Sequence, residues 1–176
     1  MASRIESLIG LVVVLSIALV VPSAVADGSK VQATVSFGQW QTDPPFDRFT
    51  VPNDRTRNQH ALIPFEVEIK AGGAVNFIIS GFHEPTIYDA GTQPGDINTS
   101  QVVTALGFPD LINDSTNRIF RGVDPRTAPT AQDRVESVTF HKPGTYLVIC
   151  AVHPHFEPTP GTFVMFGFVK VTGKDK

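Results

Sequence analysis

Cysteine is the scarcest informative residue in this 176-residue chain, because Cys150 is the only one. A single cysteine cannot form an internal disulfide bond, so the chain is not a small scaffold held together by disulfides. Its sulfur is then a buried inert thiol, a link to another chain, or a reactive or metal-binding group. Basic runs are also absent and the formal net charge is −3. Nucleic acid is therefore not an expected partner.

The sequence also lacks an apolar run long enough for a comfortable membrane-spanning helix, which needs about 20 residues. Its longest run, residues 8–21, follows Arg4 and precedes Ala24-Val25-Ala26. A basic start, an apolar middle and an Ala-x-Ala end are typical of a secretory signal peptide; an uncleaved membrane anchor is the alternative. We expect residues 1–26 to be the signal peptide. Residues 27–176 would be one exported domain, periplasmic or secreted, monomeric and without stable membrane insertion after processing.

Helical periodicity is missing from the rest of the chain. Apolar and polar residues instead alternate along Val31–Phe37, and again along Phe65–Lys70, as in half-buried strands. Many short strands separated by Gly and Pro turns are typical of an antiparallel β-sandwich or barrel. We therefore predict an all-β fold. The other expected strands cover residues 74–80, 86–88, 135–140, 145–150 and 162–171.

An irregular insertion is expected around residues 89–134, which are rich in Gly, Pro, Asp, Asn and Thr. So long a stretch with little regular structure usually has a role of its own. Its apolar residues between Leu106 and Ile112 indicate one helical turn or a hydrophobic flap.

The last third of the chain holds residues at metal-ligand spacing. His153 and His155 follow Cys150 by three and five positions. Met165 stands at the return into the last expected strand, and His83 ends a strand far upstream. Two histidines and a cysteine in a near-trigonal plane, with a long bond to a methionine, suit copper that changes its oxidation state. These five residues are therefore the candidate ligands of one copper ion per chain.

Three stretches resemble the cupredoxin family. Residues 140–150, Phe-His-Lys-Pro-Gly-Thr-Tyr-Leu-Val-Ile-Cys, match the pattern F-x-x-P-G-x-Y-x-x-x-C, and residues 165–171, Met-Phe-Gly-Phe-Val-Lys-Val, match the closing M-x-G-x-V-x-V. Residues 74–83 resemble the strand that delivers the first histidine. The resemblance implies a Greek-key β-sandwich and a blue copper centre. It also implies one-electron transfer between redox partner proteins, without enzymatic catalysis.

The loop after Cys150 departs from the family pattern in two ways. It is longer than in plastocyanin-like or azurin-like members, so Glu157 or a backbone carbonyl competes with Met165 for the axial position. It also offers two histidines, at the C-x2-H and C-x4-H spacings that different members use. We favour His155, because Pro154 restricts the preceding His153 to an extended backbone.

The other departure is Glu84, which follows His83 where many members carry an asparagine. Hydrogen bonds between the loop of the first histidine and the loop after the cysteine orient the ligands and tune the metal. With a glutamate at this position, the sequence leaves open which hydrogen bond joins the two loops.

Two alternative functions stay open at this point. If His83, Cys150, His153 and His155 all bound the metal, the centre would resemble the red copper protein nitrosocyanin and would serve catalysis or sensing. The other alternative is a module that binds copper and delivers it to an oxidase.

Overall fold

The structure is a computed structural model that describes residues 30–38, 41–42, 45–47, 61–127, 133–153, 155–156 and 165–173. The expected signal peptide over residues 1–26 lies outside these ranges, as does Glu157. Among the described residues, no helix is both long enough and apolar enough to cross a membrane.

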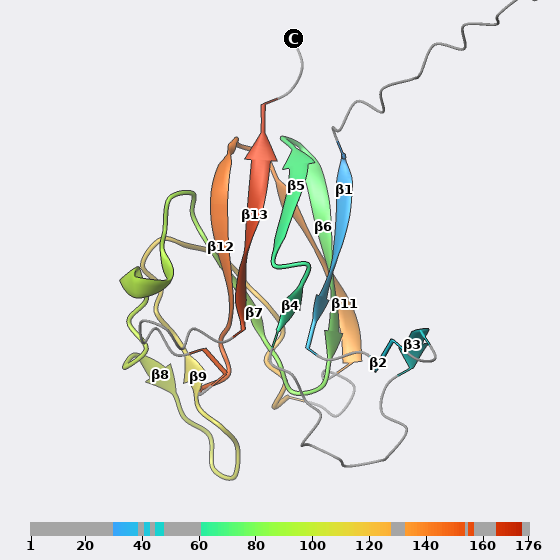
Figure 1. The fold of residues 1–176 in the computed structure, drawn as a ribbon. Helices are drawn as coiled ribbons and strands as arrows, with labels where there is room; N and C mark the ends of the chain where they lie inside the picture. The colour runs from blue at the N-terminus through green and yellow to red at the C-terminus, as the bar shows by residue number, and fades with distance from the viewer. Residues whose placement is uncertain are drawn as a thin grey trace, which may run out of the picture.

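Two β-sheets pack face to face (Figure 1), which confirms the predicted all-β sandwich. The first sheet contains β1 (Gln32–Phe37), β4 (Leu62–Ile63), β6 (Gly73–Ser80) and β11 (Asp133–Phe140), in the order β11-β6-β1-β4. The second contains β5 (Glu66–Lys70), β7 (Pro85–Tyr88), β10 (Arg118–Arg121), β12 (Gly144–Cys150) and β13 (Phe166–Thr172), in the order β10-β7-β12-β13-β5.

Two short strand pairs lie outside the sandwich sheets. β2 (Gln41–Thr42) pairs with β3 (Pro45–Asp47), and β8 (Val102–Val103) pairs with β9 (Leu111–Ile112). The helical residues in the described part form one 3-10 turn, Pro94–Asp96.

The alternation in the sequence becomes the alternation of burial in the strands. Along β6, Val75, Phe77 and Ile79 are fully buried, and the residues between them are half-buried. Successive side chains of a strand point to opposite faces of the sheet, so these three side chains fill the space between the sheets. Full burial of each contributes about 1.5–3 kcal/mol, which is why this pattern fixes the fold.

Two strand pairs run parallel where the sequence suggested an antiparallel sandwich: β1 with β6, and β13 with β5. Parallel neighbours require a crossover connection. Between β1 and β6 the chain passes through β5 in the other sheet, and β13 returns beside β5 from the far end of the sequence. The chain therefore changes sheet repeatedly instead of forming a simple meander.

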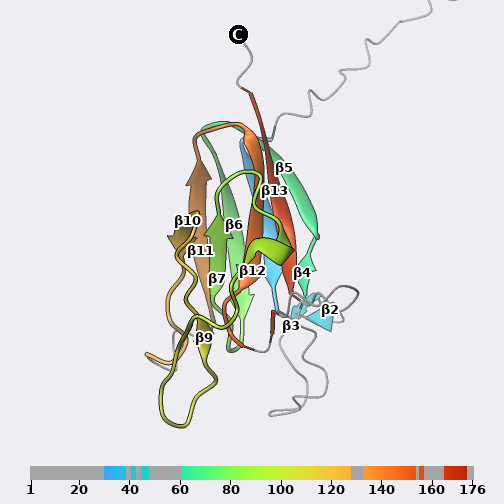
Figure 2. The same ribbon diagram turned by 90° about the vertical axis from the view of Figure 1, so that its left-hand side faces the viewer.

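The predicted insertion covers the outer face of the second sheet (Figure 2). Ile97 and Ile112 of the insertion pack with Tyr88, Leu147 and Ile149 of that sheet in one buried cluster. The expected flap or helical turn is partly a strand, since β9 lies at its end. The described residues of the insertion, 89–127, thus form a layer on the sheet, and β10 within them is the edge strand of that sheet.

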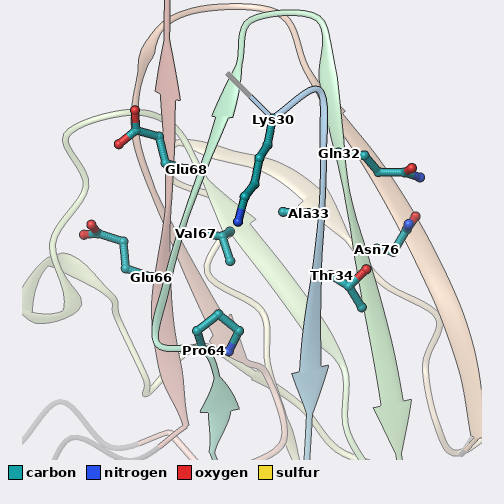
Figure 3. A pocket seen from close by; sticks show the side chains of 9 residues that line it. All are labelled: Lys30, Gln32, Ala33, Thr34, Pro64, Glu66, Val67, Glu68 and Asn76. Atoms are coloured by element: carbon teal, nitrogen blue, oxygen red, sulfur yellow. The ribbon is translucent and has the colours of Figure 1, made fainter. Parts of the chain in front are cut away.

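A cleft of about 450 Å³ opens between β1 and β5, at the side where the two sheets part (Figure 3). Lys30, Glu66 and Glu68 lie around it together with small and polar residues. None of its nine lining residues is a candidate metal ligand, so the cleft is separate from the site described next.

Candidate metal centre

Three of the five candidate ligands come together at the lower end of the sandwich in Figure 1, where β6 and β12 end. The ligand atoms of His83, Cys150 and His155 all lie within 4.8 Å of one another. The Cys150 Sγ atom is 3.6 Å from the Nδ1 atom of each histidine. The two Nδ1 atoms are 3.1 Å apart. The three donor atoms therefore form a nearly equilateral triangle.

The strand pattern of β12 delivers the sulfur into the space between the sheets. Tyr146, Val148 and Cys150 belong to the inner apolar cluster, whereas Leu147 and Ile149 belong to the cluster under the insertion. Because side chains alternate along a strand, the last residue of β12 shares the inner face with Val148. Cys150 is accordingly fully buried.

Of the two histidines near the sulfur, one precedes Cys150 in the sequence and the other follows it. His83 lies in the turn that joins β6 to β7, and its side chain is fully buried. His155 follows β12 in a tight turn in which its N–H donates to the Val152 carbonyl, at 2.7 Å. His155 is only half-buried, so it is the member of the group nearest to solvent.

Gly38, directly after β1, packs closely against the His83 ring. A Cβ atom at this position would lie 2.8 Å from the ring Cδ2 atom and 2.5 Å from the Ser80 carbonyl oxygen. Gly38 also has a φ of +99°, which other residues rarely adopt. The Phe37 ring meets the His83 ring edge to face, with 6.1 Å between ring centroids. The ring is therefore held by its surroundings as well as by its own turn.

The triangle of donors has the size that a metal ion requires. Bonds of about 2.0 Å to imidazole nitrogen and about 2.3 Å to thiolate sulfur are usual for an ion such as zinc. With 120° between the bonds, such an ion would separate its nitrogen donors by about 3.5 Å and each nitrogen from sulfur by about 3.7 Å. The observed separations of 3.1 and 3.6 Å are close to these values, so the residues fit one ion.

Burial raises the pKa of the Cys150 thiol to about 12, and two backbone N–H groups act in the opposite direction. These N–H groups, of Glu84 and Val152, donate to the sulfur and favour its charged form. A thiolate at this place needs a positive partner, because an isolated buried charge is very costly. A cation held by Cys150 and the two histidines would supply that charge, and its binding would release the thiol proton.

His153 is not part of the group. Its backbone N–H donates to the Asp110 carbonyl at 2.9 Å, and the residue is half-buried. His155 lies two residues further along and turns back toward the sulfur. Of the two histidines after the cysteine, the structure thus brings His155 to the sulfur.

Met165 lies directly beside the cysteine. Its carbonyl accepts the Cys150 N–H at 3.1 Å, and its side chain belongs to the same buried cluster as Cys150. Its backbone has a φ of +50°, which is uncommon for a residue with a side chain. Its axial role stays a prediction.

Glu84 and Arg121 are site residues that the sequence did not single out as a pair. Glu84 is fully buried next to His83, and its Oε1 atom accepts a short hydrogen bond from Arg121 Nε. Burial raises the pKa of the Glu84 carboxyl, and Arg121 partly offsets this effect. A glutamate beside a ligand was visible in the sequence, but nothing in the sequence indicates its arginine partner 37 positions away.

Comparison with solved structures gives matches of low similarity, three of which are described here. An auracyanin from Roseiflexus castenholzii is 17% identical, with 82% of this chain and 98% of that chain covered and a TM-score of 0.48. Auracyanin A, a "blue" copper protein from Chloroflexus aurantiacus, is 15% identical, with 82% and 100% covered and a TM-score of 0.42. A pseudoazurin from Hyphomicrobium denitrificans is 16% identical, with 80% and 74% covered and a TM-score of 0.39.

No model of a known protein family matches the sequence, and no curated protein matches it. Because the structural similarities are weak, the assignment depends on the chain's own strands and side chains. Two mixed sheets form a sandwich, and a buried cysteine meets two histidines at one end of it, beside a methionine. These features are the β-sandwich and the cysteine-histidine group that the sequence resemblance to cupredoxins implied.

Proposed function

We propose that this protein binds one copper ion and carries single electrons between redox partner proteins. The observation that carries the proposal is the buried Cys150 sulfur, which lies 3.6 Å from two histidine Nδ1 atoms. Copper held by two imidazoles and one thiolate, with a weak axial methionine, can change between its two oxidation states. Cys150 ends a strand and the two histidines lie in turns that directly follow strands, so the three side chains should move little when the charge of the metal changes.

The chain's own residues supply the conditions for that chemistry. Cys150 would hold the ion as a thiolate after loss of its proton, and each histidine would offer its Nδ1 lone pair. The N–H groups of Glu84 and Val152 stabilise negative charge on the sulfur. Phe37, packed against the His83 ring, helps to exclude water from the inner side of the site.

Burial favours a carrier over an enzyme. His83 and Cys150 are fully buried, and a catalytic metal needs a position that is open to substrate. The half-buried edge of His155 offers the shortest way for an electron to enter. Nearby, Phe108 of the insertion stacks on Phe82 with 6.1 Å between ring centroids, and Phe108 is 47% exposed. This apolar surface next to His83 suits contact with a redox partner.

The test is the absorption spectrum of the protein loaded with copper(II). A blue centre shows an intense thiolate-to-copper band that disappears on reduction and returns on reoxidation. Cys150→Ser should abolish the band while the circular dichroism of a β-sandwich is retained. A band that survives in Cys150→Ser would overturn the assignment. A red centre with wide copper hyperfine splitting would replace the carrier by the red copper alternative.

Export is part of the proposal and depends on residues 8–21 and Ala24-Val25-Ala26. Cleavage after Ala26 would release residues 27–176 to the periplasm or the medium, where the partners would be other exported redox proteins. Mass spectrometry of the native protein should find Asp27 at its N-terminus. An intact Met1 in the membrane fraction would instead indicate an uncleaved anchor.

A further inference from the structure

The insertion contacts the loop that carries the second histidine. β9 lies beside the segment that follows Cys150: the Ile112 N–H donates to the Ala151 carbonyl at 2.7 Å, and Leu111 forms an antiparallel bridge with Val152. The hydrogen bond from the His153 N–H to the Asp110 carbonyl continues this pairing. The chain between Cys150 and His155 is therefore held by a strand of the insertion.

The insertion also contacts the segment that carries the first histidine. β10 pairs with β7, and beyond its end the Gly122 N–H donates to the Pro85 carbonyl at 2.8 Å. Arg121, the last residue of β10, forms the ion pair with the buried Glu84 carboxylate. The residue immediately after His83 is thus fastened to the insertion by its side chain.

Arg121 joins these two regions through one guanidinium group. Its Nε atom donates to Glu84, and its Nη1 atom donates to the Asn113 Oδ1 atom at 2.8 Å. Asn113 directly follows β9. The donors of a guanidinium are fixed in one plane, so Arg121 sets the distance between the His83 segment and the strand that pairs with the other ligand loop.

We propose that Arg121 is a positioning residue of the metal centre, which fixes the His83 loop relative to the Cys150–His155 loop through Glu84 and Asn113. This inference deepens the proposed function and depends on it. Glu84 makes the link direct, because its backbone N–H donates to the Cys150 sulfur while its side chain is held by Arg121. Movement of Glu84 would therefore change the hydrogen bonding of the thiolate.

Stability alone does not account for this arrangement. A buried ion pair is often no more stabilising than apolar residues of the same volume, because both charges lose their hydration. Hydrogen bonds around a copper-bound sulfur, by contrast, tune the reduction potential of the metal. Loss of contacts that orient metal ligands typically lowers metal affinity by about 10–100-fold.

The decisive variant is Arg121→Lys, which keeps the positive charge but cannot present the same two donors in a fixed plane. Arg126→Lys is the matched control. Arg126 belongs to the same insertion and is equally engaged, with Asp124 and with the Val103 carbonyl, but its hydrogen bonds reach neither ligand loop. Copper(II) affinity would be measured by competition with a chelator, together with the absorption band and the reduction potential.

We expect Arg121→Lys to weaken copper binding by about 10-fold or more, to shift the band and to change the potential. Arg126→Lys should leave all three as in the wild type. Asn113→Ala removes only one of the two acceptors, so it should change the same properties in the same direction by less. It decides the question if Arg121→Lys does not fold. Equal values for Arg121→Lys, Asn113→Ala and the control would overturn the inference.

Amide hydrogen exchange in the metal-free protein separates this inference from the proposed function. Exchange at the Glu84 and Val152 amides should be faster in Arg121→Lys than in the wild type and unchanged in Arg126→Lys. If the wild type gave no thiolate-to-copper band, the copper proposal would be wrong, and the exchange rates would still decide whether Arg121 holds the loops. Unchanged exchange at both amides would overturn the positioning role even in a protein that binds copper.

Discussion

Cys150 illustrates how a single residue acquires its chemistry from its place on a strand. As the last inward-facing residue of β12 it is fully buried, and burial raises the pKa of its thiol to about 12. The same position brings it to the turn at the end of β6, where His83 lies. A residue that composition alone would interpret as an inert core thiol thus becomes a candidate ligand.

The two histidines after Cys150 give the first prediction. His155→Ala should bleach or strongly shift the visible band, because the His155 Nδ1 atom is one of the three clustered donors. His153→Ala should leave the position of the band nearly unchanged, since His153 is not in the group of clustered donors and its backbone N–H pairs with the Asp110 carbonyl. Spectra of the two copper-loaded variants, side by side, provide the measurement. Loss of the band in both would indicate a four-ligand red centre.

Tyr88 gives a prediction of pH dependence. Burial raises the pKa of its phenol from 10.0 to about 12, and the hydroxyl donates to the Asp114 carbonyl at 3.1 Å. Below pH 10 the phenol is neutral in both states, so its contribution to stability is complete there. Between pH 10 and 12 the unfolded chain ionises first, so the free energy of unfolding falls as the pH rises.

Tyr88→Phe should remove this part of the alkaline decrease, although it loses one hydrogen bond worth about 1 kcal/mol. Urea unfolding of the metal-free protein at pH 9, 10 and 11 measures it. The Cys150 thiol titrates in the same direction, so each variant is compared with the wild type at the same pH. Parallel curves for the two proteins would contradict the assignment to Tyr88.

At the scale of elements, the turn after β1 and the turn after β6 form one unit around the His83 ring. Gly38→Ala should destabilise the metal-free protein, because the new methyl group would lie 2.5 Å from the Ser80 carbonyl oxygen and 2.8 Å from the His83 ring. Gly91→Ala is the matched control: Gly91 has a similar φ of +93°, but a Cβ atom there has no neighbour within 4 Å. Both variants introduce backbone strain, and only Gly38→Ala adds overpacking.

We expect Gly38→Ala to lower the free energy of unfolding by about 1–3 kcal/mol more than Gly91→Ala does. It should also shift the copper band, because the His83 ring must move. Urea unfolding and absorption spectra measure the two effects. Equal losses in both variants would mean that backbone strain alone, and not contact with the Ser80 carbonyl and the His83 ring, makes glycine necessary at position 38.

The long strands were predictable and the short ones were not, for a physical reason. β6 buries alternate side chains and β12 buries five consecutive ones, and both strands are visible in the sequence as apolar segments bounded by turn residues. β8 and β9 have two residues each, too few to show a period, and their pairing depends on distant backbone. The packing of Gly38 against His83 and the hydrogen bonds of Arg121 to Glu84 and Asn113 are likewise contacts between distant segments, which no local sequence pattern indicates.

For the whole molecule, the sandwich holds the site and the insertion holds its loops. The candidate ligands come from the β6–β7 turn, from the end of β12 and from the loop after it, so a metal ion would join the two sheets at one end. A ligand that binds the folded protein and not the unfolded chain stabilises it by mass action. Copper binding should therefore be visible in the stability of the entire domain, and not only in its spectrum.

The last prediction concerns the stability of the protein with copper bound and after copper is removed. With free copper at 1,000 times its dissociation constant, the free energy of unfolding should rise by up to about 4.1 kcal/mol. Binding to the cysteine and histidines of the unfolded chain would reduce this gain, so the figure is an upper bound. A chelator should return the stability to the metal-free value. Cys150→Ser is the control, because it leaves both histidines in place and should lose most of the gain. Equal stabilisation of wild type and Cys150→Ser would show that the copper binds elsewhere on the surface, since Cys150 is the only thiol in the chain.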